Sequence, residues 1–355
     1  MFVIKSYRQA VIFCVITMLC WGSWSNTLKL AEKLAEDWRF ELFYWDYVFG
    51  VLLMAVVFAL TMGSIGKEGR NFLADMRQAA KGNVTSAFLG GMVFNAANIL
   101  LVAAIAVAGM SVAFPVGIGL ALVVGVLVNY RAQPKGDPIK LFGGVALIVV
   151  AILLCAWAYA QVPVDPDKEK ASPMIGLGLA VLCGLLMGFF YRFVAAAMPE
   201  PKPENFINMP PGKLSPYSAM VFFSVGILAS QLLFNFANIL GAVTAAPFET
   251  PGYFSGSVGV HLLGILGGMI WAVGMTFSII AFGRAGPAIS YGLGQGATLV
   301  AAFWGVFIWI EFAEAFKESP WVTSLLILLM FAGYVGGLAL IILAGMKTQE
   351  QEAAS

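Results

Sequence analysis

Long apolar runs dominate this sequence and leave it one class of fold. A membrane-spanning helix needs about 20 apolar residues. Ten stretches meet that length: 10–29, 42–63, 83–106, 109–130, 140–161, 173–195, 215–240, 256–282, 286–311 and 321–346. Only 11% of the residues are charged, against about 25% in a soluble domain. In hydrocarbon, backbone polar groups must bond within the segment, so we expect an all-α integral membrane protein in a lipid bilayer.

The basic residues predict how the chain is oriented. The first run has full length and no small-residue cleavage site after it, so we interpret it as a helix rather than a removed signal. With a cytoplasmic N-terminus, 14 of the 20 Lys and Arg fall in cytoplasmic segments and 6 in outer ones. Cytoplasmic loops carry this excess. We expect a multi-pass membrane protein with both the N- and the C-terminus cytoplasmic.

The ten runs divide into two sets of five. The first set occupies 1–161 and the second 173–346, with a short polar linker at 162–172. Residues 347–355, "KTQEQEAAS" without further apolar content, are expected to form a disordered tail. Because each half has an odd number of helices, the halves must insert in opposite senses.

An internal repeat supports this division. Shifting the chain by 177 residues aligns 89–123 with 266–300, and eleven of these 35 positions are identical without a gap. Both segments begin with Leu-Gly-Gly-Met, have Ala-Gly at the turn and continue with Gly-x-Gly. The sequence therefore predicts ten transmembrane helices arranged as two inverted five-helix repeats.

Helix-breaking residues occupy matching places in the two repeats. The positions are Pro115, Gly117 and Gly119 in the first half and Gly292, Gly294 and Gly296 in the second. Proline removes a helical hydrogen bond, and glycine costs about 1 kcal/mol in a helix interior. Irregular segments at corresponding places in inverted halves indicate a transport site between the repeats. The alternative is close helix packing, which small residues allow.

Asp46 is the only carboxylate several residues inside an expected span. An ionisable side chain there is costly and functional by default, and a carboxyl group in an apolar cavity can bind and release a proton near neutral pH. We predict that Asp46 couples transport to protons. The alternative is a solvated carboxylate, with the span beginning near Tyr47. Glu311 and His261 are placed at membrane interfaces.

Carboxamides form two stripes within the spans. Asn95 and Asn98 share one face of the third span, and Gln231, Asn235 and Asn238 share one face of the seventh. Carboxamides both donate and accept hydrogen bonds without charge, which suits a neutral polar solute. They also hold membrane helices together, so ligand binding and helix association both remain open.

Aromatic residues in the first span complete the candidate binding site. In "CWGSWSN", Trp21 and Trp24 lie one turn apart, with Asn26 nearby. Aromatic faces and an amide suit a sugar or a planar heterocycle, whereas an interfacial aromatic belt would explain the same residues. Three residues of the second half extend the expected lining: Trp271, Tyr291 and Gln295.

Several function classes find no support in the sequence. The net charge of +1 argues against nucleic acid as a partner, and the four cysteines and single histidine have no metal or redox spacing. No ATP-binding loop and no nucleophile–base pair are present. We therefore expect a transporter rather than an enzyme, with no cofactor and no bound metal, driven by an ion gradient.

Five short motifs together resemble one transporter family over nearly the whole chain. They are "CWGSW" in the first span, Tyr44-Trp45-Asp46-Tyr47, "SPYSAMVFFS" at 215–224, "GGMIWAVGMTFSIIAFGRAGPA" at 267–288, and Phe303-Trp304-Gly305 leading to Glu311. The chain resembles the drug/metabolite transporter superfamily, and more narrowly the ureide permeases and related glucose/ribose porters. Asp46 matches the aspartate of the permeases' Leu-Asp-Tyr motif, although Trp45 replaces the leucine. Unlike plant ureide permeases, the chain has no long central loop.

The resemblance implies a carrier of the plasma (cell inner) membrane for small neutral polar solutes. The expected function is secondary active uptake of a ureide or nucleobase, coupled to a proton or another cation, by alternating access. One alternative is a sugar uptake porter. A second is a multispecific efflux carrier, although the glutamate expected in the first span of such a pump is absent between Cys14 and Asn26. The substrate, the direction of transport and the oligomeric state remain open.

Overall fold

The computed structural model describes residues 1–35, 38–108, 110–161, 173–236 and 250–354, and within these ranges the regular structure is helical. The helices are α1 (Tyr7–Ser23), α2 (Ser25–Leu34), α3 (Phe40–Leu60), α4 (Phe72–Gln78), α5 (Lys81–Ala108), α6 (Met110–Ala132), α7 (Pro138–Ala160), α8 (Pro173–Ala197), α9 (Pro203–Ile207), α10 (Pro216–Phe236), α12 (Thr250–Phe254), α13 (Val258–Ala285), α14 (Pro287–Gly294), α15 (Ala297–Phe303), the π-helix η1 (Trp304–Ile308), α16 (Ala313–Glu318) and α17 (Pro320–Ala354).

Ten of the described segments are long and apolar enough to cross a membrane, which confirms the fold class. Five of the spanning helices begin at a proline, whose missing N–H is not needed in the first turn; these are Pro138, Pro173, Pro216, Pro287 and Pro320. The first span consists of α1 and α2, which meet at Trp24. The ninth consists of α14, α15 and η1.

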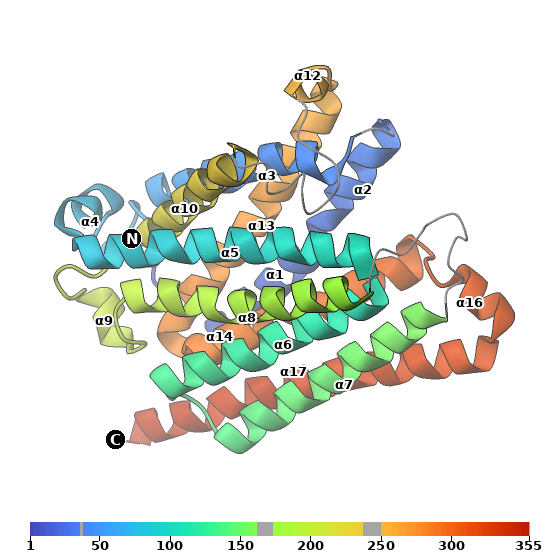
Figure 1. Cartoon of the computed structure of the whole chain (residues 1–355). Helices are drawn as coiled ribbons and strands as arrows, with labels where there is room; N and C mark the ends of the chain where they lie inside the picture. The colour runs from blue at the N-terminus through green and yellow to red at the C-terminus, as the bar shows by residue number, and fades with distance from the viewer. Residues whose placement is uncertain (36–37, 109, 162–172, 237–249, 355) are drawn as a thin grey trace.

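Both termini lie at the same end of the bundle, together with the short helices α4 and α9 (Figure 1). We call this the termini end. The tips of α2, α12 and α16 lie at the opposite end. This arrangement is what an even number of spans requires.

Glycines bring two pairs of helices into close contact in the middle of the bundle. A Cβ atom on Gly268 of α13 would overlap the carbonyl of Tyr47 on α3. A Cβ atom on Gly91 of α5 would overlap the carbonyl of Phe223 on α10. Small residues at such crossings let membrane helices approach through their backbones. Side chains adjoining the crossings, including Asp46 and Asn95, are thereby held against the opposite helix.

The expected helix break at Pro115, Gly117 and Gly119 is absent. α6 runs without interruption from Met110 to Ala132. Pro115 lies in the second turn, where it removes a single backbone bond. Gly117 lies at a close contact with α8, since a Cβ on Gly184 of α8 would lie 2.8 Å from the Gly117 oxygen, whereas a Cβ on Gly119 would meet only Ile152, at 3.9 Å.

The second half does contain the expected interruption. α14 ends at Gly294, a turn at Gln295 and Gly296 follows, and α15 begins at Ala297. The Gly296 N–H bonds to the Leu293 carbonyl, three residues back, as in a tightened 3₁₀ turn. Gly292 lies inside α14.

Two further expectations concern the chain between and after the halves. The linker at 162–172 lies outside the described residues. The last helix continues through 347–354, so this part of the expected disordered tail is helical. Its Gln, Glu and Ala residues are good helix formers, and they extend a helix that is already nucleated.

Candidate functional site

Asp46 is buried at the junction of α3 and α13, with 3% of its surface exposed. α3 begins at Phe40, so the carboxylate lies in the second turn and is not solvated at a span boundary. Tyr253 donates a 2.5 Å hydrogen bond to Oδ1 of Asp46, and Nδ1 of His261 lies 2.8 Å from Oδ2. Both carboxylate oxygens therefore have a partner from the second half of the chain.

Neighbouring rings hold the His261 side chain in place beside Asp46, and the phenol of Tyr253 stays protonated there. The His261 ring packs edge-on against Trp38 and Tyr253, with centroids 4.9 and 4.8 Å apart. Burial and the hydrogen bond to Asp46 raise the pKa of Tyr253 above its ordinary value, so the phenol stays protonated and donates throughout the physiological range. Sequence reasoning placed His261 at an interface and missed Tyr253, which lies on the short helix α12 outside the spans.

The carboxamides of the third span form a buried network rather than a free surface. The Tyr44 hydroxyl donates to Oδ1 of Asn95 at 2.8 Å and accepts from Nδ2 of Asn98 at 3.0 Å. Nδ2 of Asn95 points the other way and donates to Ser230 at 3.0 Å and Gln231 at 3.3 Å. The network connects α3, α5 and α10, which favours helix association for Asn95 and Asn98. Asn235, the remaining carboxamide of the predicted site, has its side chain outside the described residues.

Next to this network lies a cluster of aromatic rings centred on Trp271, which we call the central aromatic cluster. The rings that contact Trp271, with their centroid distances, are Phe94 at 4.5 Å, Trp21 at 5.9 Å, Phe223 at 6.0 Å and Tyr47 at 6.4 Å. Trp24 reaches the cluster through Tyr47, at 4.8 Å. The structure thus brings the predicted residues Trp21, Trp24 and Trp271 together in the interior of the bundle.

The interruption in the second half positions Trp21. A Cβ on Gly274 would lie 2.7 Å from Cδ1 of Trp21, and a Cβ on Gly294 would lie 2.7 Å from its Cζ3. The indole is therefore held between α13 and the end of α14. Gln295, in the turn that follows, is nearly buried. Tyr291 is fully buried and bonds to two backbone carbonyls at 3.1–3.2 Å, so the structure gives it a packing role.

The end opposite the termini is closed by polar contacts between the halves. Asn26 of α2 accepts a 2.6 Å hydrogen bond from the Trp309 indole, which places it away from the central aromatic cluster. Glu311 is ion-paired with Lys29 and accepts a 2.6 Å hydrogen bond from Tyr159. Ile310, which lies between Trp309 and Glu311 in the sequence, has φ +54°, a left-handed conformation that is strained for a β-branched residue.

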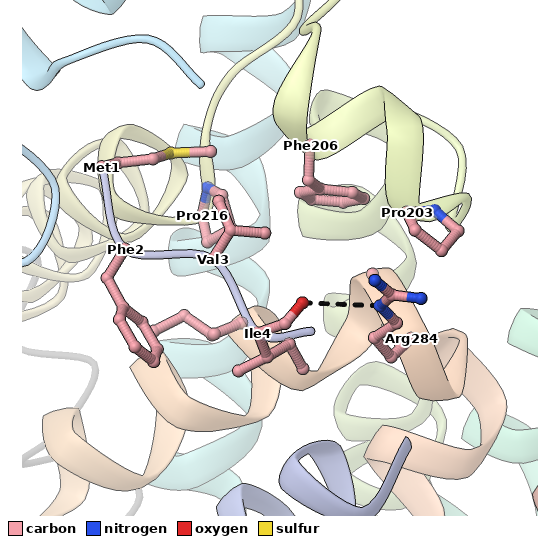
Figure 2. Close-up of a pocket in the computed structure, with 10 residues that line it drawn as sticks. Met1, Phe2, Val3, Ile4, Pro203, Phe206, Pro216 and Arg284 are labelled. Atoms are coloured by element: carbon pink, nitrogen blue, oxygen red, sulfur yellow. Dashed lines mark hydrogen bonds between the residues drawn. The ribbon is translucent and has the colours of Figure 1, made fainter. Parts of the chain in front are cut away.

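The first residues of the chain cover the termini end (Figure 2). The Tyr217 hydroxyl donates to the Phe2 carbonyl at 3.0 Å, and Nε of Arg284 lies 3.4 Å from the Ile4 carbonyl. A pocket between this segment and the ends of α9, α10 and α13 is lined mainly by apolar side chains. None of the predicted site residues lines it.

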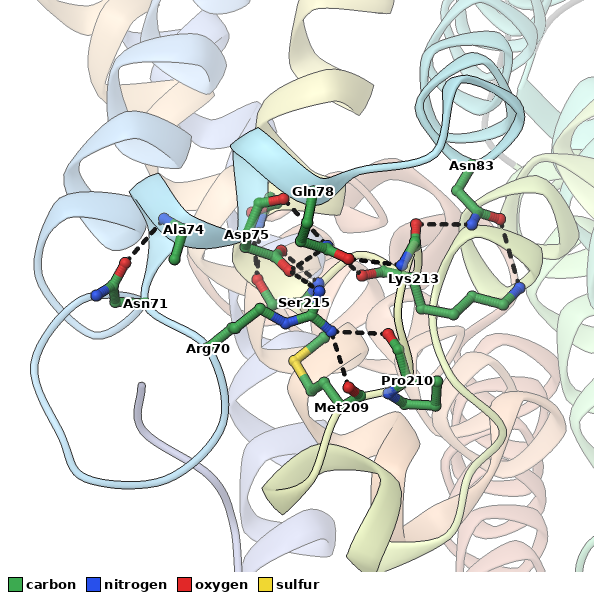
Figure 3. Close-up of polar contacts among 12 residues, drawn as sticks. Arg70, Asn71, Ala74, Asp75, Gln78, Asn83, Met209, Pro210, Lys213 and Ser215 are labelled. Atoms are coloured by element: carbon green, nitrogen blue, oxygen red, sulfur yellow. Dashed lines mark hydrogen bonds and ion pairs between the residues drawn. The ribbon is translucent and has the colours of Figure 1, made fainter.

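A polar cluster joins the halves beside this pocket (Figure 3). Asp75 of α4 is fully buried and accepts a 2.7 Å hydrogen bond from the backbone N–H of Ser215, just before α10. Arg70 lies 3.6 Å from the same carboxylate. Because the Asp75 carboxylate is committed to this helix start and to Arg70, its contacts indicate a structural role. The sequence pattern did not reveal it because α4 is short and amphipathic.

In the part of the chain that the structure describes, fold and site together define an all-helical membrane protein with ten candidate spans, a buried Asp46 carboxylate that contacts His261 and Tyr253, and an aromatic interior. Comparison with known proteins narrows the class. A family model described as Ureide permease matches residues 43–172. Ureide permease 1 of Arabidopsis thaliana is 22% identical over 93% of this chain and 96% of its own length. Ureide permease 4 of the same plant is 23% identical over 96% of this chain and 98% of its own length.

The fold also has a solved counterpart. A crystal structure superposes with a TM-score of 0.57 at 18% identity, covering 97% of this chain and 98% of the other. At that identity the likeness concerns the fold alone. The chain-length similarity to permeases supports a membrane transporter rather than an enzyme.

Proposed function

We propose that the protein is a secondary transporter that carries a small neutral polar solute, a ureide or a nucleobase, into the cell with protons. The observation that carries the coupling is the buried Asp46 carboxylate, contacted by His261 and Tyr253 of the other half. A carboxyl group and an imidazole can each bind and release a proton. The substrate class rests on the printed names of the chain-length relatives.

Alternating access requires two halves that move against each other, and residue pairs in the structure support an inverted repeat. Phe94 and Trp271 are 177 residues apart, the offset of the sequence repeat, and their rings meet at 4.5 Å. Equivalent residues in contact lie near the axis that relates two halves. Gly91 and Gly268, also 177 apart, occupy equivalent helix crossings. We place the axis through the central aromatic cluster.

In the proposed cycle, the Asp46 contacts to His261 and Tyr253 open and close with one face of the bundle. When they are broken, the carboxylate can take up a proton from the outer solution. When they re-form, the outer face is closed and the proton leaves to the cytoplasmic side. The basic residues favour termini in the cytoplasm, so Asp46 would face the outside of the plasma membrane, the proposed location. The drug/metabolite transporter superfamily remains the proposed wider relationship.

The test is uptake into proteoliposomes that contain the purified protein. Labelled allantoin, uracil and glucose are supplied with and without an inward proton gradient. We expect a ureide or base to accumulate, and a protonophore to abolish the accumulation. Asp46→Asn should lose gradient-driven accumulation but keep substrate exchange across the membrane. Glu314→Gln, which changes an exposed carboxylate paired with Lys317, is the matched control. Full accumulation by Asp46→Asn would refute the coupling role, and exclusive glucose uptake would refute the substrate class.

A further inference from the structure

Among the buried side-chain polar atoms that have no hydrogen-bond partner in the described part of the chain, three belong to residues in or beside the central aromatic cluster. They are Nε1 of Trp21, the hydroxyl of Tyr47 and Nε2 of Gln231. Tyr47 and Gln231 are fully buried. A buried donor without a partner is costly, and native structures avoid it unless something else supplies the acceptor.

All three atoms belong to side chains in or beside the central aromatic cluster. The rings of Trp21 and Tyr47 both contact Trp271. Gln231 belongs to the adjoining network: its Oε1 accepts from Asn95, which bonds to Tyr44, and the Tyr44 ring stacks on Tyr47 at 5.1 Å. The amide oxygen of Gln231 thus already accepts a hydrogen bond, whereas its NH₂ group has no acceptor.

All three of these groups can donate a hydrogen bond. An indole N–H and an amide NH₂ can only donate, and a phenol can donate as well. A ligand that satisfies them must present acceptors, and the aromatic faces around them suit a flat ring. Carbonyl oxygens on a planar heterocycle meet both conditions, whereas sugar hydroxyls also bring donors of their own, which an indole N–H and an amide NH₂ cannot accept.

We propose that Trp21, Tyr47 and Gln231 are the specificity-determining residues of the transporter, and that their donors bind the carbonyl oxygens of the substrate. This proposal rests on the proposed function. Asn95, Asn98 and Tyr44 then act as positioning residues, because their polar atoms already bond to one another. The rings of the cluster are in mutual contact, so the substrate enters only when the halves separate and Trp21 moves away from Trp271.

The test compares substrates that differ in one acceptor. Binding of labelled uracil to the purified protein is competed with allantoin, 2-thiouracil and 4-thiouracil, because sulfur accepts hydrogen bonds poorly. Wild type should prefer uracil to at least one thio analogue. Tyr47→Phe, which removes only the hydroxyl, should weaken uracil binding by about 3- to 10-fold, the value of one neutral hydrogen bond. Tyr47→Phe should also reduce the ratio between the affinity for uracil and the affinity for the thio analogue that wild type binds less well.

A second variant and a control guard the interpretation. Gln231→Met removes the free amide donor and should weaken uracil binding to a similar extent. Tyr217→Phe removes a hydroxyl that bonds to the Phe2 carbonyl at the termini end, and it should keep wild-type affinity and preference. Size-exclusion profiles report whether each variant is folded.

The outcomes separate the two proposals. If wild type binds uracil or allantoin but Tyr47→Phe and Gln231→Met, each folded, keep its affinity and preference, the donor assignment is wrong and the proposed function stands. If either variant is misfolded, equal wild-type affinities for uracil and both thio analogues would also overturn the assignment. If wild type binds none of these compounds, the substrate class itself fails.

Discussion

Replacing Asn95 by alanine tests whether the carboxamides of the third span bind substrate or hold helices together. The side chain makes three side-chain hydrogen bonds: it accepts from Tyr44 at 2.8 Å and donates to Ser230 at 3.0 Å and to Gln231 at 3.3 Å. Interhelical hydrogen bonds in membrane proteins average about 0.6 kcal/mol each. Their combined loss should lower the free energy of unfolding by about 2 kcal/mol.

Asn98→Ala is the matched control on the same helix face. Asn98 donates one hydrogen bond, to the Tyr44 hydroxyl at 3.0 Å, so its removal should cost about 0.6 kcal/mol. Tyr44 keeps its bond to Asn95 in that variant. The structure therefore predicts a ratio of about three between the two losses of stability.

The assay is reversible unfolding in mixed micelles, followed by tryptophan fluorescence and repeated with and without substrate. A loss below about 0.5 kcal/mol for Asn95→Ala, or a larger loss for Asn98→Ala than for Asn95→Ala, would refute the helix-association role. A direct substrate contact would instead show as a loss of substrate-induced stabilisation with little change in the unliganded protein.

Two more outcomes follow from the packing and from the outer ion pair. Gly268→Ala should destabilise the protein by about 1–3 kcal/mol, as overpacking does, because the new Cβ would overlap the Tyr47 carbonyl. The control Gly82→Ala, at a position with open space around it, should leave the melting temperature unchanged or higher. Equal effects of the two substitutions would contradict the close crossing of α13 and α3. Glu311→Gln should lower the free energy of unfolding by less than about 1 kcal/mol, since the ion pair with Lys29 is partly exposed. A decrease of more than about 3 kcal/mol in the same unfolding assay would show that the pair is buried instead.

The ten spans could be predicted because they depend on local apolar length, the property that a bilayer selects. The run expected at 42–63 is the helix Phe40–Leu60, and the exclusion of Asp46 from water follows from its place in that run. Pro115 shows the limit of this reasoning. Its residue type predicts a break, but in the second turn it removes only one backbone bond, and α8 packs closely at Gly117 beside it. Residue type alone does not reveal that neighbour.

The contacts of Asp46 with His261 and Tyr253 could not be predicted from the sequence, for a different reason. Positions 177 apart share the glycine of the helix crossing, Gly91 and Gly268, and this shared glycine, which supports the proposed repeat, can be found by comparing the chain with itself. The polar residues do not repeat: Asn95 corresponds to Ala272 at the same offset. In the proposed repeat, two halves with different side chains place unlike groups opposite each other. A carboxylate of one half then meets an imidazole of the other, and only the assembled crossing shows which groups meet. The asymmetry of the site is therefore the part of this protein that required the structure.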